Sequence, residues 1–303
     1  MKYNLEEIEQ RLARLHDGSQ METCCLCRGI ELSYLILKTD QLTLPHDPLK
    51  HILEINYCRA GRMGWKMENG NNVYLGPGNY SLHTMDVCAH SVITLPNKYY
   101  EGFTLCIDLD MLSHEPPELL SGTGITGEFL IQKFCKNGIL TSFAGNAQTE
   151  SIFSGFYEQP QAFLPAYQKL KTMELLLYLG KCSVSANEHL ADYQSSQVEI
   201  IRNIHEQLTC HMDQHFTIDS LAKQYLMNPT TLKNVFKAVY GNSIAAHTRE
   251  HRMERAARLL LETQDSIARI AHAVGYGNQS KFTAVFKEYY HVLPTEYRKY
   301  HRA

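Results

Sequence analysis

A short sequence pattern occurs twice in the last third of the chain and restricts that part to a helical fold. The segment 217–222, TIDSLA, returns 49 residues later as 266–271, SIARIA, and the segment 232–237, LKNVFK, returns 50 residues later as 282–287, FTAVFK. In each copy the apolar residues recur at helical spacing. Each copy is therefore predicted to be two short helices joined by a tight turn.

Capping residues mark the ends of these predicted helices. In the first copy Thr217 is a candidate N-cap, Asn228 followed by Pro229 starts the second helix, and Gly241 ends it. The second copy starts at residue 265 or 266, turns through 275–278, GYGN, and uses the final asparagine as the next cap. Gly275 lies where the chain must turn sharply, which often requires a positive φ.

The second helix of each copy has a polar face opposite its apolar face. In the first copy that face carries Thr230, Lys233, Asn234 and Lys237. In the second copy it carries Ser280, Thr283, Ala284 and Lys287, with Gln279 and Lys281 near the N-terminus. A helix-turn-helix inserts such a face into the major groove, where Asn and Gln pair with adenine and Lys reaches guanine or phosphate. An ordinary αα-hairpin is the alternative, which two copies in register disfavour.

Charge is distributed unevenly along the chain. Residues 1–194 carry 15 Lys and Arg against 22 Asp and Glu, a net charge of −7, whereas residues 195–303 carry 14 against 10, a net charge of +4. A basic C-terminal part is typical of a domain that binds a polyanion.

The second copy and its flanks resemble the signature of AraC/XylS transcription regulators. The residues that carry the resemblance are Ile267, Ile270, Ala271, Gly275, Tyr276, Phe282, Phe286, Lys287, Pro294, Tyr297 and Arg298. The first copy is similar to the same family, and its segments TTLKNVFKAVYG and HRMERAA are similar to the siderophore-responsive branch. The segment 291–294, HVLP, departs from the family's usual Gly-x-Ser/Thr-Pro. The resemblance covers about residues 198–303.

The resemblance implies two helix-turn-helix units, joined by one helix, that read successive segments of the major groove of promoter DNA. It places Thr230, Lys233 and Asn234 of the first unit, and Gln279, Ser280, Thr283 and Ala284 of the second, at base-reading positions. It also implies RNA polymerase as a partner, a homodimer, control by a small-molecule effector or by dimerisation, and activation of transcription.

The N-terminal part is predicted to be a sensing or dimerisation domain over 1–182, followed by a linker, 183–197, and the DNA-binding domain, 198–303. Short β-like runs separated by turn residues fill about 30–108, helical patterns fill about 125–181, and the first 20 residues form a further helical pattern. The resemblance implies that the strands form a cupin-like β-barrel. The expected fold class is therefore α+β with two domains: a cupin-like barrel with flanking helices and an all-α domain.

The interior of the expected barrel offers candidate ligand-binding residues. Tyr57, Trp65 and Tyr74 are candidate lining residues, with ordinary core packing as the alternative. Metal-binding cupins need a His-x-His with a further Glu and His. The chain has no His-x-His, so a barrel without metal or cofactor is expected, although it does contain His46, His51, Glu54 and His83.

Two further features have alternative interpretations. The cluster Cys24-Cys25-x-Cys27 is either a metal or redox sensor or a set of ordinary thiols, and ordinary thiols are favoured because adjacent cysteines do not suit C-x₂-C chelation. The helix predicted over Leu164–Lys181 carries a stripe that is either internal packing or a dimer seam: Leu170, Met173, Leu177 and Gly180.

Composition excludes several other classes of protein. Apolar residues make up 44% and charged residues 20%, and no apolar run approaches the ~20 residues of a membrane span, so we expect a globular cytoplasmic protein. An enzyme such as an alkylation-repair fusion is the alternative function, but its Pro-Cys-His-Arg motif and four-cysteine zinc site are missing. A third alternative is a sugar-binding cupin whose helices make only protein contacts.

Overall fold

The computed structural model describes residues 18–138, 140–183 and 190–301 in two compact units, Met1–Ser195 and Ser196–Ala303. The helix expected in the first 20 residues falls mainly on residues 1–17, which lie outside the described residues. Within the described ranges, no helix combines the length and apolar character that crossing a bilayer requires.

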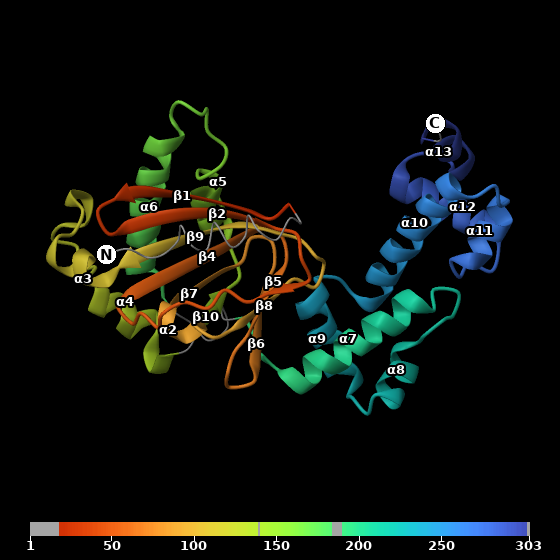
Figure 1. Ribbon diagram of the computed structural model, residues 1–303, viewed down its shortest axis with the longest axis horizontal. Coiled ribbons are helices and arrows are strands. Elements are labelled where there is room, and N and C mark those ends of the chain that lie inside the picture. Colours follow the sequence, from red (N-terminus) through yellow and green to blue (C-terminus); the bar gives the residue numbers. More distant parts are fainter. Residues whose placement is uncertain (1–17, 139, 184–189, 302–303) are drawn as a thin grey trace. The chain divides into compact units, whose positions relative to one another are not determined.

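The N-terminal unit contains two antiparallel sheets (Figure 1). The larger has the order β1 (Gln20–Cys27), β2 (Ile30–Leu37), β9 (Tyr100–Asp108), β4 (Ile52–Gly61), β7 (Tyr80–Thr84) and β10 (Thr141–Phe143). The smaller has the order β11 (Tyr193–Gln194), β6 (Asn71–Leu75), β5 (Met63–Lys66), β8 (Val92–Thr94) and β3 (Gln41–Leu42). The β-rich α+β fold is confirmed, but the described strands pair as two sheets and not as one closed barrel.

The two faces of the larger sheet pack against different partners, because successive side chains of a strand point in opposite directions. On β4, Tyr57 joins the core shared with the helices, where its ring stacks on Phe153 with 4.3 Å between the centroids. Cys58 joins the core shared with the smaller sheet, which includes Trp65. The helices of this unit are α2 (Met85–Cys88), α3 (Leu109–His114), α4 (Gly127–Phe134), α5 (Ala147–Ser154) and α6 (Leu164–Lys181), with 3-10 turns η1 (Glu118–Leu120) and η2 (Lys136–Gly138).

The end of the expected linker has regular structure. Residues 184–189 lie outside the described ranges, but β11 pairs with Asn71 and Asn72 of β6. The Asn72 side chain donates hydrogen bonds to the Tyr193 carbonyl and the Ser195 hydroxyl, at 3.3 and 2.9 Å. The missing apolar pattern predicts a linker as far as residue 197, whereas polar groups tie residues 193–195 to the smaller sheet.

The C-terminal unit is built of helices. They are α7 (Ser195–Cys210), α8 (Ile218–Gln224), α9 (Pro229–Tyr240), α10 (Ile244–Glu262), α11 (Ile267–Ala273), α12 (Gln279–Tyr290) and α13 (Pro294–His301). Helices α8 and α9 form the first helix-turn-helix, α11 and α12 form the second, and α10 joins them (Figure 1). The second pair packs on α10 through a core that includes Met253, Leu260, Phe282 and Phe286.

The predicted caps fix where these helices begin and end. Thr217, Asn228, Ser266 and Asn278 each accept a hydrogen bond from a backbone amide in the first turn of the following helix. Gly241 ends α9 in the left-handed region with φ of +85°. Each cap satisfies a backbone group that has no partner within the helix, which contributes about 1 kcal/mol.

Candidate nucleic-acid interface

The polar face of α9 is exposed as predicted. Its apolar side buries Leu232, Val235 and Phe236. The four candidate contact residues are all exposed: Thr230, Lys233, Asn234 and Lys237. Neither lysine has an ion-pair partner among the described residues. The face therefore presents two positive charges, a hydroxyl and an amide.

The corresponding face of α12 is less suited to reading bases. Gln279, Ser280, Lys281 and Lys287 are exposed, whereas Thr283 is half-buried. Ala284 is exposed and offers a methyl group where α9 offers the Asn234 amide. The next turn carries Glu288, whose carboxylate lies 3.8 Å from the Arg249 guanidinium. Its negative charge would repel a DNA phosphate.

The apolar side of α12 differs from the expected one in its last turn. The helical pattern predicts that Tyr289 is buried, but its side chain is 40% exposed. Tyr290 packs inward instead, with 4.7 Å between its ring centroid and that of Phe286 and 5.0 Å to that of Tyr297. Helix α13, which supplies Tyr297, fixes this choice.

A groove lined by α10, α12 and neighbouring segments contains two cationic side chains in addition to Lys281. Arg249, Arg252 and Lys281 line it, and its volume is about 320 Å³. Arg252 is anchored, because its guanidinium donates to the Gln214 carbonyl at 2.8 Å and lies 5.9 Å from the centroid of Tyr276. Burial lowers the pKa of Arg252 from its usual value, and Tyr276 acts in the opposite direction. The sequence pattern does not single out either arginine as a site residue, and their only signal is the Arg content of α10.

The N-terminal unit has a small cavity that faces the smaller sheet. Its volume is about 90 Å³, below the about 300–1,000 Å³ typical of sites for drug-sized ligands. Of the three predicted lining residues, Trp65 lines it. Tyr57 does not line the cavity, because its side chain points to the face of β4 that packs against the helices. Tyr74 does not line it either: Tyr74 is the cross-strand partner of Gly64, so its side chain points to the face of the smaller sheet away from Trp65.

The clustered cysteines lie on β1, at one edge of the larger sheet. Cys24 and Cys25 are exposed and Cys27 is partly exposed, and all three are free thiols. Burial raises the pKa of Cys24 and of Cys27, and Cys25 raises both further, although Lys169 acts in the opposite direction on Cys27. Higher thiol pKa values reduce the thiolate fraction, so the ordinary-thiol interpretation stays favoured.

Helix α6 has an exposed apolar row. Of the predicted stripe, Met173 is buried, but Leu170 is 53% and Leu177 41% exposed. Phe163 and Tyr167 continue the exposed row toward the N-terminus at 61% and 38%. The spacings from 163 to 167 and 170 alternate four and three residues as in a coiled-coil seam, and 177 lies seven residues further on, with Glu174 at the position between them.

Comparison with known proteins assigns the family. A helix-turn-helix domain model matches residues 221–300, from α8 to α13. The transcriptional activator RhaR of Mannheimia succiniciproducens is 29% identical over 230 residues, which are 76% of this chain and 81% of that protein. The arabinose operon regulatory protein of Salmonella typhimurium is 31% identical over 135 residues, but the match spans only 47% of its length.

A solved structure matches the C-terminal unit. The C-terminal domain of AraT from Geobacillus stearothermophilus is 33% identical, and the match covers 34% of this chain and 87% of that one with a TM-score of 0.33. The similarity to the siderophore-responsive branch stays a prediction. Two capped helix-turn-helix units on one joining helix, a matching domain model and regulators among the relatives lead to one assignment: the chain belongs to the AraC/XylS family of DNA-binding transcription regulators.

Proposed function

We propose that α9 is the main base-reading helix and that α12 mainly holds the DNA backbone. The observation that carries this division is the contrast between the two exposed faces: Asn234 on α9 against Ala284 on α12. Asn pairs with adenine through two hydrogen bonds, whereas Ala offers only a methyl group. Thr230 and Lys233 would add base contacts, and Lys237, Lys281 and Lys287 would hold phosphates.

Residues near the start of α12 complete the proposed interface. Gln279, Ser280 and Thr283 would contribute the remaining base contacts of the second unit. Arg249, on the groove beside Lys281, would add a phosphate contact, since its side chain is 52% exposed. Phosphate contacts orient the protein on the duplex but carry no sequence information.

The N-terminal unit would control this binding. We infer a homodimer that forms through the exposed row of α6, because a second copy of the same helix would cover the row symmetrically. Two DNA-binding domains would then occupy repeated half-sites, and an effector bound in the N-terminal unit would alter that occupancy. We also propose contact with RNA polymerase and activation of transcription, which the resemblance to the family implies.

Selection of bound sequences from a random duplex library by the purified full chain tests the proposal. We expect a repeated half-site in the selected DNA and a log–log salt slope of about −0.9 for each phosphate neutralised. A Lys233→Ala, Asn234→Ala double variant should select a more degenerate motif. Recovery of no enriched sequence by folded protein would contradict specific DNA binding.

A further inference from the structure

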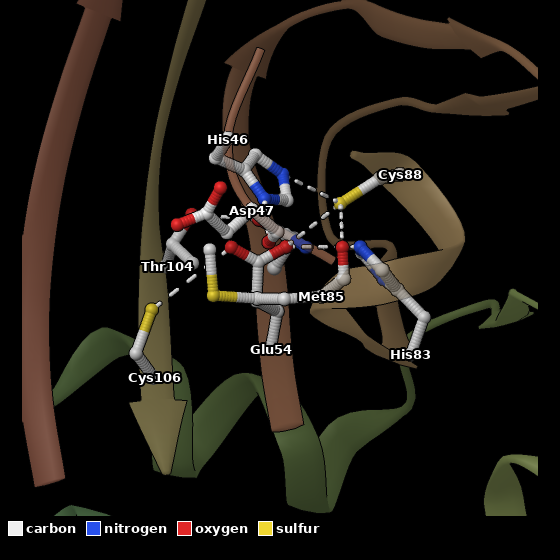
Figure 2. Close-up of polar contacts among 9 residues, drawn as sticks. His46, Asp47, Glu54, His83, Met85, Cys88, Thr104 and Cys106 are labelled. Atoms are coloured by element: carbon white, nitrogen blue, oxygen red, sulfur yellow. Dashed lines mark hydrogen bonds and ion pairs between the residues drawn. The ribbon is translucent and has the colours of Figure 1, made fainter. Parts of the chain in front are cut away.

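Four side chains with metal-binding atoms lie near one another beside the cavity in the N-terminal unit, and three of them, His46, Glu54 and Cys88, line it (Figure 2). Glu54 lies on β4, His83 on β7 and Cys88 at the end of α2, and their ligand atoms all lie within 4.8 Å of one another. His46 approaches from the segment between β3 and β4, with its Nε2 atom 3.4 Å from the sulfur of Cys88. Figure 2 shows the four groups directed toward one another.

The fold produces this convergence from residues that are far apart in sequence. Glu54 and His83 are direct cross-strand partners in the β4–β7 pairing, so their side chains point to the same face. Helix α2 begins immediately after β7 and carries Cys88 back over that face. The group therefore does not depend on a His-x-His motif, and its absence from the sequence does not exclude a metal site.

Two of the three short distances between these groups fall within the edges of a tetrahedral coordination site, and the third is shorter. For bond lengths of about 2.0–2.3 Å to Zn²⁺, neighbouring ligand atoms of a tetrahedron lie roughly 3.3–3.8 Å apart. Here Glu54 Oε2 is 3.0 Å from His83 Nε2 and 3.4 Å from Cys88 Sγ, and Cys88 Sγ is 3.4 Å from His46 Nε2. Glu54, His83 and Cys88 form a compact group, whereas His46 is close to Cys88 alone and would have to move toward the other two for one ion to contact all four atoms.

Neighbouring groups support a ligand role for both histidines. The His46 Nδ1 atom lies 3.0 Å from the Asp47 carbonyl, and a proton held there leaves the Nε2 lone pair directed at the cluster. The His83 side chain is fully buried, and neither ring nitrogen has a hydrogen-bond partner within the described ranges, although Nε2 lies 3.0 Å from the Glu54 carboxylate, an ion pair only when the imidazole is protonated. A buried imidazole costs free energy unless its polar atoms are satisfied, and a metal ion would satisfy Nε2.

We propose that Glu54, His83, Cys88 and His46 form a binding site for one divalent transition-metal ion, with Zn²⁺ the best match. Two nitrogens, one sulfur and one carboxylate oxygen suit Zn²⁺, whereas Mg²⁺ and Ca²⁺ favour sites made of oxygen alone. Binding would replace the Cys88 thiol proton, so the thiolate would become a ligand and the proton would pass to solvent. The site does not depend on which DNA the C-terminal unit reads.

A second histidine group, in the C-terminal unit, is a competing metal site. The ligand atoms of His205, His247 and His251 also lie within 4.8 Å of one another. These rings already hydrogen-bond to each other: His247 Nε2 lies 2.8 Å from His205 Nδ1 and 3.1 Å from His251 Nε2. The His205 ring also stacks on Tyr240. This group contains no sulfur, which allows the two sites to be distinguished by spectroscopy.

Titration of the full chain with Co²⁺ tests the proposal, since only a site with a thiolate gives a sulfur-to-cobalt charge-transfer band. The background variant replaces Cys24, Cys25, Cys27, Cys182 and Cys210 by Ser, because these thiols are at least partly exposed. We expect the band to saturate at one Co²⁺ per chain and Zn²⁺ to displace it. Cys88→Ser should abolish the band.

Matched controls separate ligand loss from misfolding. Cys58→Ser alters a buried thiol that bonds only to backbone carbonyls of β4, so the band should persist. Glu54→Gln keeps the thiol but should weaken Co²⁺ affinity by at least about tenfold, while the far-UV spectrum stays unchanged. A folded background variant without the band, or a band that persists unchanged in Cys88→Ser, would overturn the proposal.

Discussion

Leu226 and Gly275 occupy the same position in the two helix-turn-helix units, and both have a left-handed backbone, with φ of +52° and +81°. The next residue in each case donates to an equivalent carbonyl: Met227 to Ala222 at 3.0 Å and Tyr276 to Ala271 at 2.9 Å. The surroundings differ. Leu226 is 94% exposed, whereas a Cβ atom at Gly275 would collide with the Met212 carbonyl oxygen.

Gly275→Val should unfold or strongly destabilise the C-terminal unit. A β-branched residue resists positive φ, and its Cβ would collide with backbone, which cannot move aside as a flexible side chain does. The loss should be several kcal/mol, as for other large steric errors, at least about 3. Trp65, the only tryptophan, reports on the N-terminal unit, so its fluorescence transition in urea should not move while the helical circular dichroism is lost.

The matched control is Gly277→Ala, since no atom lies within 4 Å of a Cβ at Gly277 and its φ is not positive. That variant should retain helicity. A Gly275→Val protein with native helicity and DNA binding would refute the structural role of Gly275.

Leu226→Asn should stabilise the first helix-turn-helix. The left-handed conformation costs most residues about 1–2 kcal/mol, and Asn tolerates it better. Because the Leu226 side chain is exposed, little packing is lost, and we expect a gain of about 0.5–1 kcal/mol in the free energy of unfolding. Urea unfolding followed by circular dichroism measures it, and a lower midpoint would show that Leu226 makes a contact that offsets its strain.

Asn234→Ala and Lys287→Ala should have different effects on DNA binding. Loss of the Asn234 amide should relax preference at one or two base pairs, by about 1–3 kcal/mol against the wrong base. Loss of the Lys287 charge should weaken binding to all sequences alike and reduce the salt slope by about one. Binding titrations on the selected site and on single-base variants at three salt concentrations measure both effects. A uniform loss in both variants would contradict the proposed division.

The helix caps and turns could be predicted from the sequence, but which face of each strand packs against which part of the core could not. Thr217, Asn228 and Gly241 act within one turn of their own helix, so their neighbours in sequence suffice to predict them. Strand β1 has no clear apolar alternation, and its place depends on pairing with β2. Tyr57 and Tyr74, named only as candidate lining residues, lie on faces that do not line this cavity, because residue type alone does not give the phase of a strand.

The metal-ligand group shows the same limit more clearly. Glu54 and His83 are 29 positions apart and meet only through the β4–β7 register. A shift of that register by one residue would place the two side chains on opposite faces. The sequence therefore contains the ligands without showing that they converge.

Acid should destabilise the C-terminal unit through His247. Burial, with the neighbouring His251 and His205, lowers the pKa of His247 to about 3. The unfolded chain binds a proton near pH 6.5, so it takes up more protons than the native unit between pH 6.5 and 3, and stability falls as pH falls through this range. From pH 7 to pH 5 the expected loss is about 2 kcal/mol, measured by urea unfolding followed by circular dichroism.

The test variant is His247→Gln, in which the loss of unfolding free energy between pH 7 and pH 5 should be smaller. His272→Gln, at an exposed position on α11, should leave the loss as it is in the unmodified chain. An unchanged pH profile in His247→Gln would show that other groups dominate the acid response.

Leu170→Glu should convert the proposed dimer to a monomer. A charge in the middle of the exposed row would have to be buried without a partner in the seam, whereas in a monomer it stays in water. Lys169→Glu introduces the same carboxylate at the neighbouring exposed position outside the row and should leave the dimer intact. Sedimentation velocity of the full chain measures both, and the melting temperature should change little, because neither side chain is buried.

The monomeric variant should also lose its preference for a paired half-site over a single one, since that preference comes from the effective concentration of the second DNA-binding domain. A chain that is monomeric before mutation, or a Leu170→Glu variant that sediments as a dimer, would exclude α6 as the seam.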